Sequence, residues 1–368
     1  MTSAVLTLVG GLLGLVLTGS AIVSGASTIG LRIGLPPLVV GLTIVAAGTS
    51  APELAVVWRA ADAGDPGLAL GSVVGSNIAN VLLVVGLVAA FGAIPIARRT
   101  RRIELPVMVA ASIGTFVLAA DGTIERRDGA ILLVGLVAFI ASMVLMQRRT
   151  GDAAHDEPDP DPDPRPDARD TLRAVGLFAI GVVGVAVAAQ FVVTGAEDIA
   201  LSLGVPQLVV GLTVLAVGTS APEIVTSVIA AFRGRSDIAV GNAIGSNVFN
   251  LLFVLGAVSS THSDIPVADE LIRVDLPVMI GVAALCIPIA FTNAAITRWE
   301  GITFVGLYAG YTAYLVLDGL DNSAAPIVGG VTLAAVVPPL AWTVRVLTTR
   351  GKPTGRRGVA PRSVERPS

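Results

Sequence analysis

Two glutamates are the strongest candidates for chemistry because each lies inside an otherwise apolar stretch. Glu53 and Glu223 end the same hexapeptide, Gly-Thr-Ser-Ala-Pro-Glu, at 48–53 and 218–223. A carboxylate at membrane depth costs at least about 2.5 kcal/mol, so it marks a functional site by default. The alternative is a structural acid that is hydrogen-bonded across helices. The presence of an identical polar cluster in both places argues against that alternative.

The residues around each glutamate are suited to half of a cation site. Pro52 lacks an N–H, which frees a carbonyl near Gly48, where glycine lets the helix unwind. Broken helix at membrane depth is tolerated only where it lines a cavity or is covered by protein. Carboxylate, hydroxyl and carbonyl oxygens suit hard cations such as Ca2+, and no thiolate or imidazole is offered to a softer metal. The candidate oxygens belong to Glu53, Thr49, Ser50 and the Ala46 carbonyl, and in the second copy to Glu223, Thr219, Ser220 and the Ala216 carbonyl.

A second motif, Gly-Ser-Asn-x-x-Asn, follows each hexapeptide. It contributes Ser76 and Asn80 in the first copy, and Ser246 and Asn250 in the second. Residues four apart share one face of a helix, so each serine and asparagine pair can face the same site. Taken alone this motif also fits close helix packing through its glycines. Together with the hexapeptide in each copy, it indicates an ion site.

The elements that carry these residues must be membrane-spanning helices. The 368 residues are 54% apolar and only 14% charged, with a mean hydropathy of +0.82. A soluble domain carries about a quarter charged residues, so a soluble enzyme or binding module is excluded. Apolar stretches of membrane length predict an all-α polytopic membrane protein with ten or eleven spans. The predicted spans lie near 4–27, 36–58, 68–91, 106–120, 129–146, 173–196, 206–232, 238–258, 276–292 and 301–317, with an extra run at 326–347.

The chain divides into two halves that are copies of one another. Residues 25–86 align with 195–256 at a constant offset of 170, with 31 identities in 62 positions. The linker at 151–170 alternates Asp and Pro, which cannot form a helix or bury a side chain. We therefore predict a first repeat at 1–150 and a second at 171–320. An extra C-terminal helix and a basic tail complete the chain at 321–368.

The number and charge of the spans predict how the halves are oriented. Five spans per half is an odd number, so the second copy must be inverted, an arrangement typical of transporters. An outside N-terminus would place 20 of the 24 Lys and Arg residues on the cytoplasmic side. By the positive-inside rule, we expect the linker and the C-terminus to be cytoplasmic and the N-terminus to lie outside the cell membrane.

The paired motifs resemble those of the cation/Ca2+ antiporter superfamily, and in particular of the prokaryotic sodium/calcium exchanger family. The resemblance implies ten core helices and alternating access, in which the first and sixth helices slide across the rest. It implies that Glu53 and Glu223 bind Ca2+ with help from Thr49 and Thr219. The Na+ positions implied by the resemblance use Ser50, Ser76, Ser220, Ser246, Asn80, Asn250 and the carbonyls of Ala46 and Ala216. Some members carry an aspartate where this chain has Asn250, which bears on coupling and pH response.

Secondary antiport, with Ca2+ moving outward and Na+ inward, is the expected function. Proton-coupled exchange of Ca2+ remains an alternative because two glutamates can also exchange protons. A membrane-embedded hydrolase using Ser50 or Ser220 is remote, since no histidine or lysine lies within the spans to activate a serine. A passive channel fits inverted repeats less well than alternating access does. We expect the transported cations and the lipid bilayer as partners, without an organic cofactor or nucleic acid. The oligomeric state is left open.

Overall fold

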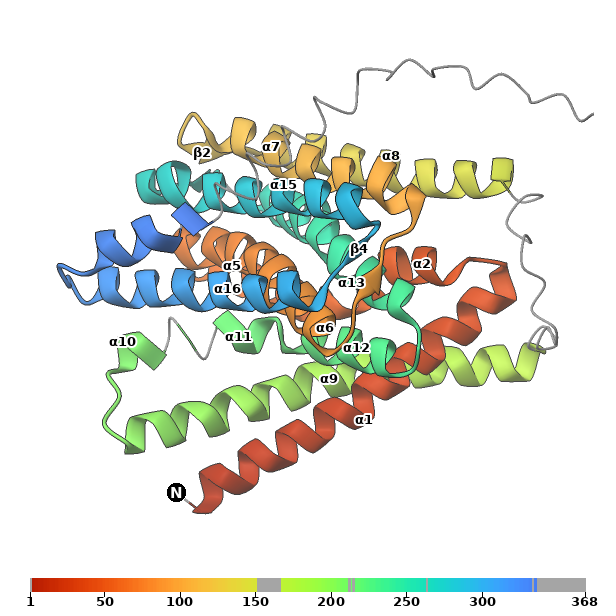
Figure 1. Ribbon diagram of the computed structural model, residues 1–368, viewed down its shortest axis with the longest axis horizontal. Coiled ribbons are helices and arrows are strands. Elements are labelled where there is room, and N and C mark those ends of the chain that lie inside the picture. The colour runs from red at the N-terminus through yellow and green to blue at the C-terminus, as the bar shows by residue number, and fades with distance from the viewer. Residues whose placement is uncertain are drawn as a thin grey trace, which may run out of the picture.

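The protein is nearly all helical, as the computed structural model in Figure 1 shows for residues 2–150, 167–210, 213, 216–262, 264–332 and 334–335. The first half comprises α1 (Thr2–Ile33), α2 (Pro37–Val40), the π-helix η1 (Gly41–Val45), α3 (Ala46–Thr49), α4 (Ala51–Asp62), α5 (Pro66–Ala79), η2 (Asn80–Val85), α6 (Gly86–Phe91), β1 (Ile94–Pro95), η3 (Thr100–Glu104), α7 (Leu105–Ala119), β2 (Thr123–Ile124) and α8 (Arg126–Thr150). The second half comprises α9 (Ala168–Ser202), α10 (Gln207–Val210), α11 (Ala216–Thr219), α12 (Ala221–Phe232), α13 (Ser236–Phe249), η5 (Asn250–Leu255), α14 (Gly256–Thr261), β3 (Ile265–Pro266), η6 (Leu271–Asp275), α15 (Leu276–Asn293), β4 (Ala295–Ile296) and α16 (Arg298–Gly319).

Eight helices in the described part of the chain are long and apolar enough to cross a membrane. This confirms the predicted polytopic all-α class. The span predicted at 206–232 is described in separate pieces, α10, α11 and α12. The 22-residue α16 is not among the eight, since it carries three tyrosines and charged residues near both ends.

The predicted boundaries are only partly within the described residues. The first three residues of α9, which begins at Ala168, fall within the predicted linker, because the Asp167 side chain accepts a hydrogen bond from Asp170 N and caps the first turn. The rest of the linker lies outside the described residues. Of the extra run predicted at 326–347, the structure describes residues 326–332 and 334–335, and all of these are helical.

Helices α1 and α9 lie side by side and run antiparallel along one side of the molecule, with α7, α8 and α15 on the opposite side (Figure 1). Gly25 of α1 packs on Ala174 and Phe178, at the start of α9. Gly195, near the end of α9, packs on Ala4 and Leu8 of α1. The two sets of contacts are equivalent, because Gly195, Ala174 and Phe178 correspond to Gly25, Ala4 and Leu8 at the repeat offset of 170. Equivalent helices of the two repeats therefore meet with opposite directions, as inverted repeats require.

The short strands follow the same two-fold relation, because each pairs with a strand of the other repeat. Strand β1 pairs antiparallel with β4, and β2 pairs antiparallel with β3. Each ribbon joins the loop after the third span of one repeat to the loop between the fourth and fifth spans of the other. The two repeats thus interlock at both ends of the helices.

Burial identifies the centre of the protein. In the span Ser236–Thr261, 94% of the most apolar stretch is buried, compared with 22% in α1 and in α9. Helices α13 and η5, which carry the second Gly-Ser-Asn motif, therefore lie in the core. The exposed apolar faces of α1 and α9 are suited to contact with lipid.

Candidate cation site

Each candidate glutamate sits at the start of a helix that follows a break. Ser50 separates α3 from α4, and Ser220 separates α11 from α12. Pro52 and Pro222 stand in the first turn of the new helix, where a missing N–H costs nothing. Glu53 and Glu223 consequently lie in the first turns of α4 and α12. The positive end of a helix dipole favours a carboxylate at this position.

The fold brings these two glutamates together at the centre of the protein. The side chains of Glu53 and Glu223 are 1% and 0% exposed, and the two carboxyl groups are close enough to interact with one another. Thr49 and Ser246 also lie near the Glu223 carboxyl group. Two acids 170 positions apart in the sequence thus form one buried cluster, which is closed to solvent in this structure.

The second motif is placed around this cluster by α5 and α13. Ser76, Asn80, Ser246 and Asn250 are all buried, with at most 2% exposure. Asn80 and Asn250 each begin a π-helical segment, η2 and η5. Such segments inside α-helices occur frequently at functional sites. The sequence did not predict them.

Hydrogen bonds join residues of one repeat to residues of the other. Asn250 Nδ2 donates to Ser76 Oγ over 3.0 Å. Thr49 Oγ1 and Ser246 Oγ are 3.3 Å apart and share a hydrogen bond. Each of these links pairs a residue of one candidate half-site with a residue of the other, so the two halves form a single cluster.

Several oxygens at the centre are buried without any hydrogen-bond partner among the described residues. A buried polar group without a partner costs free energy, and in a native structure it requires an explanation such as an ion. These oxygens include both carboxylate oxygens of Glu53 and of Glu223, Ser50 Oγ, Ser220 Oγ, Asn80 Oδ1 and Asn250 Oδ1. Oxygen atoms of this type are the ligands that hard cations prefer.

The remaining predicted residues are placed less tightly. Ala46 O accepts a hydrogen bond of 2.9 Å from Ser50 N, and Thr49 Oγ1 lies 3.4 Å away, so the helix break leaves this carbonyl with a partner in its own turn. Thr219 is only partly buried at the end of α11. Ala216 begins that helix, and its side chain lies outside the described set. The structure therefore groups nine of the predicted residues more clearly than Thr219 and the two alanines.

Sequence reasoning missed a buried polar group beside the site. Asn242, Thr226 and Ser227 are all 0% exposed. Asn242 accepts a hydrogen bond of 3.1 Å from Thr49 Oγ1 and donates one of 2.9 Å to Ser227 Oγ. The available signal was spacing, since Asn242 lies four residues before Ser246 and Ser227 four residues after Glu223, on shared helix faces.

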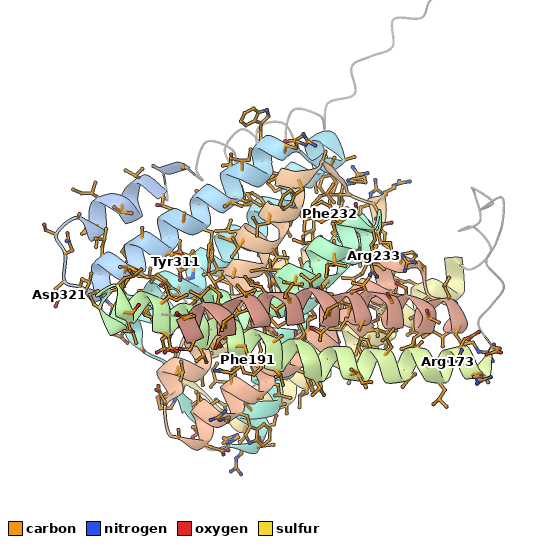
Figure 2. All side chains as sticks on the ribbon, turned by 90° about the horizontal axis from the view of Figure 1, so that it is seen from below. Arg173, Phe191, Phe232, Arg233, Tyr311 and Asp321 are labelled. Carbon is orange, nitrogen blue, oxygen red and sulfur yellow. The ribbon has the colours of Figure 1, made fainter. Side chains whose placement is uncertain are left out.

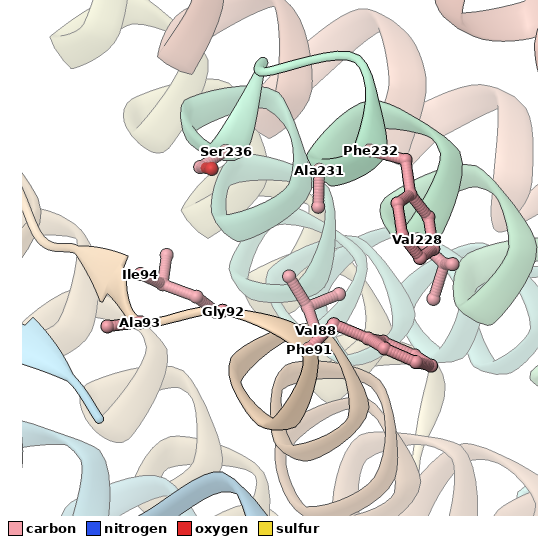
Figure 3. Close-up of a pocket in the computed structure, with 9 residues that line it drawn as sticks. All are labelled: Val88, Phe91, Gly92, Ala93, Ile94, Val228, Ala231, Phe232 and Ser236. Carbon is pink, nitrogen blue, oxygen red and sulfur yellow. The ribbon is translucent and has the colours of Figure 1, made fainter. Parts of the chain in front are cut away.

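No group of three or more His, Cys, Asp or Glu side chains suited to holding a metal occurs among the described residues. The charge of the cluster is therefore limited to two carboxyl groups among neutral oxygens. A cavity of about 140 Å³ lies elsewhere, where α6 and α12 end (Figure 3). Its lining includes Val88, Phe91 and Phe232 and neither candidate glutamate, so this cavity is separate from the carboxylate cluster.

Comparisons with known proteins agree with this arrangement. The family described as "Sodium/calcium exchanger protein" matches residues 3–145 and 173–317. The chain is 37% identical over 251 residues to the putative antiporter CaxA of Alkalimonas amylolytica, covering 67% of this chain and 77% of that protein. It is 30% identical over 337 residues to the sodium/calcium exchanger MaX1 of Methanosarcina acetivorans, covering 83% of this chain and 96% of that protein.

The solved structures lead to the same group. A structure of the sodium-calcium exchanger NCX_Mj, soaked with 10 mM Na+ and zero Ca2+, matches with a TM-score of 0.71 and 30% identity. The match covers 84% of this chain and 98% of that chain. These relatives are transporters rather than enzymes, so the hydrolase alternative is set aside.

Proposed function

The chain belongs to the sodium/calcium exchanger family, and on this premise we propose that it exchanges Ca2+ for Na+ across the cell membrane by alternating access. Membership of the family makes it a multi-pass cation/Ca2+ antiporter. The identity of the coupling ion and the transport cycle of this chain are the proposed part.

The observation that carries the proposal is the set of buried oxygens without partners around Glu53 and Glu223. Two carboxylates are neutralised equally well by one Ca2+ or by two Na+. A site that binds either one Ca2+ or two Na+ is therefore electrically neutral in both cases. The neutral hydroxyl and amide oxygens supply further ligands without adding charge.

We assign the ligands as follows. Glu53 and Glu223 bind Ca2+, and Thr49 and Thr219 contribute to the same position. The Na+ positions use Ser50, Ser76, Ser220, Ser246, Asn80 and Asn250, with the carbonyls of Ala46 and Ala216. The unpartnered oxygens of Ser50, Ser220, Asn80 and Asn250 support the Na+ assignment.

The packing of α1 and α9 supports alternating access. The two helices pack on one another through glycines, and they present apolar faces outward. Because the surfaces of α1 and α9 are mostly apolar, the two helices can slide along the core without breaking many hydrogen bonds. The enclosed carboxylates correspond to an occluded state, and movement of the pair would open the site to one side at a time.

Coupling to Na+ rather than H+ is favoured by the neutral oxygens. Exchange of protons needs only the two acids, whereas Ser50, Ser220, Asn80 and Asn250 would then remain buried without partners. A bound Na+ gives these oxygens a partner. Proton coupling is the competing outcome of the experiment below.

The proposed orientation has the linker and the C-terminus in the cytoplasm. Hydrogen bonds in the structure support the grouping of loops on which this orientation rests, because they join residues of loops that were expected on the same side of the membrane. Arg126 Nε donates to His262 O, and Arg298 Nη2 donates to Phe91 O. The first pair was expected outside and the second inside. The orientation itself is tested by single cysteines at Arg98 and Asp121, because the native Cys286 is buried. Only the first should react with a membrane-impermeant reagent from the cytoplasmic side.

The decisive experiment measures Ca2+ uptake into sealed vesicles that contain the purified protein. One set of vesicles carries an outward Na+ gradient, and a matched set carries only an outward H+ gradient. We expect uptake with the Na+ gradient and little with the H+ gradient. Uptake driven by the H+ gradient alone would replace Na+ coupling with proton coupling. Uptake with neither gradient, down the Ca2+ gradient only, would indicate a channel.

A further inference from the structure

A relay of hydrogen bonds ties Thr49 of the first repeat to the second repeat. Asn242 stands at its centre and belongs to neither of the two motifs. We propose that Asn242 is a positioning residue of the cation site, which holds the Thr49 hydroxyl proton away from the ion so that Thr49 offers a lone pair to it. This inference rests on the proposed function, because it concerns the same Ca2+ site.

The direction of the relay is determined by main-chain carbonyls, which can only accept hydrogen bonds. Ser227 Oγ donates to Ala239 O at 3.4 Å, so its oxygen is left to accept from Asn242 Nδ2 at 2.9 Å. The same amide nitrogen lies 3.5 Å from Glu223 O, a second pure acceptor. Both contacts require the nitrogen of the Asn242 amide on this side. Asn242 Oδ1 must therefore face Thr49.

Thr49 is consequently the donor in its contact with Asn242. The distance from Thr49 Oγ1 to Asn242 Oδ1 is 3.1 Å, and an amide oxygen only accepts. Asn242 Oδ1 is closer to this hydroxyl than the main-chain acceptor Ala46 O, which lies 3.4 Å away. A hydroxyl has one proton and two lone pairs. With the proton directed at Asn242, the Thr49 oxygen is left as an acceptor beside the Glu223 carboxyl group. An oxygen of this kind can bind a cation without reorienting.

The relay is buried and its groups are matched to one another. Thr49, Asn242 and Ser227 are each 0% exposed. All the hydrogen-bonding atoms of the Asn242 amide have partners. In a low-dielectric interior, a fully satisfied network of this type is rigid and specifies one geometry. Partners behind metal ligands act in the same way, and their loss weakens metal binding by about 10- to 100-fold.

The relay exists in only one half of the two-fold arrangement. At the repeat offset of 170, Ser72 stands where the second repeat has Asn242, and Val57 stands where it has Ser227. Valine cannot accept a hydrogen bond, so the first repeat cannot build the same relay behind Thr219. The Asn–Ser pair behind Thr49 thus has no counterpart of the same residues in the first repeat, although the two motifs are identical.

The test measures Ca2+ binding to the purified full-length protein and its saturation in exchange. The variant Asn242→Ser carries the residue that the first repeat has at this position, and its side chain is too short to join Thr49 to Ser227. We expect the Kd for Ca2+ to rise by about 10- to 100-fold. The maximal exchange rate at saturating Ca2+ should stay within about twofold, because the variant leaves every proposed ligand side chain in place and saturating Ca2+ compensates for the weaker binding. The matched control is Ser72→Ala, for which we expect an unchanged Kd.

A double-mutant cycle separates positioning from simple packing. If Asn242 acts through the hydroxyl of Thr49, then Asn242→Ser should have little further effect on Kd in a Thr49→Val background. Should Asn242→Ser fail to fold, Ser227→Ala removes the next link and should raise Kd in the same direction by a smaller factor.

The outcomes distinguish this inference from the function on which it rests. Absence of Ca2+ binding by the wild type would overturn the proposed function and this inference with it. Wild-type binding with an unchanged Kd in Asn242→Ser, or in Ser227→Ala, would overturn the positioning role alone. An equal loss of affinity in the Thr49→Val background would do the same.

Discussion

The side-chain amide of Asn250 donates a hydrogen bond of 3.0 Å to Ser76 Oγ, which joins the central asparagine of the second repeat to a serine of the first. Both residues are buried, and Asn250 Oδ1 has no partner among the described residues. Asn250 is therefore both a link between the repeats and a candidate ligand. Its neutrality keeps the charge of the cluster at two carboxyl groups.

This arrangement predicts the behaviour of Asn250→Asp. The variant exchanges a donor for a titratable carboxyl group beside two others, while it keeps an oxygen at the same place. We expect Ca2+ exchange to persist at neutral pH and to depart from wild type as the pH rises and the added group ionises. The measurement is Ca2+ flux in vesicles as a function of pH. Superimposable profiles would show that Asn250 does not line the site.

Loss of either central carboxylate should abolish transport. In Glu53→Gln or Glu223→Gln, one Ca2+ faces a single carboxylate in a poorly solvating interior. A unit charge pair at about 4 Å contributes about 4 kcal/mol at an effective dielectric constant of about 20, so we expect a loss of more than about 100-fold. Na+-driven Ca2+ uptake is the measurement, and size-exclusion chromatography of the purified variants in detergent checks that they are folded. Asp198→Asn, an exposed acid on α9, is the control. Near-native uptake in either glutamine variant would rule out a paired-carboxylate site.

The close approach of α1 and α9 should depend on glycine at the contact positions. A Cβ added at Gly25 would lie 2.7 Å from Ala174 O, and one at Gly195 would lie 2.6 Å from Leu8 N. Main-chain atoms cannot move aside easily, so Gly25→Ala and Gly195→Ala should each lower stability by about 1–3 kcal/mol. Thermal unfolding in detergent measures this effect. Gly10→Ala is the matched control, since nothing lies within 4 Å of its added Cβ, and an equal loss there would contradict the packing argument.

A polar link between Arg233 and α1 should restrain the second half of α1. Arg233 lies beside α1 in Figure 2, where its guanidinium group donates to Ser24 Oγ at 2.7 Å and to Ser20 Oγ. The other repeat has Ala63 at the equivalent position, so the link exists on one side only. Arg233→Ala should lower stability by about 1 kcal/mol. It should also speed amide hydrogen exchange in residues 20–33 of α1.

The control for this prediction is Arg235→Ala, which removes a neighbouring charge and leaves the contacts with Ser20 and Ser24 in place. Hydrogen exchange followed by mass spectrometry compares the two variants. Identical exchange in wild type and Arg233→Ala would mean that the link does not restrain α1.

The amino-acid sequence by itself determined the class of the protein, the duplication and the candidate ligands. These features are local or periodic. Apolar runs reveal spans because a bilayer requires them, and the repeated Glu53 and Glu223 motifs can be compared directly at an offset of 170. An odd number of spans per copy then requires inversion. None of these steps depends on knowing which helices touch.

Tertiary structure alone decided which side chains meet. Thr49 and Asn242 are 193 positions apart, and Arg233 and Ser24 are 209 apart, so their contacts depend on how the helices cross. A single sequence indicates which residues share one face of a helix, but it does not show which faces of different helices lie against one another. The difference between the repeats at the Asn242 relay was hidden for the same reason. Ser72 and Asn242 occupy equivalent positions in the two repeats. The consequence of this difference is visible only in the fold, which places Thr49 on one side of the Asn242 amide and Ser227 on the other.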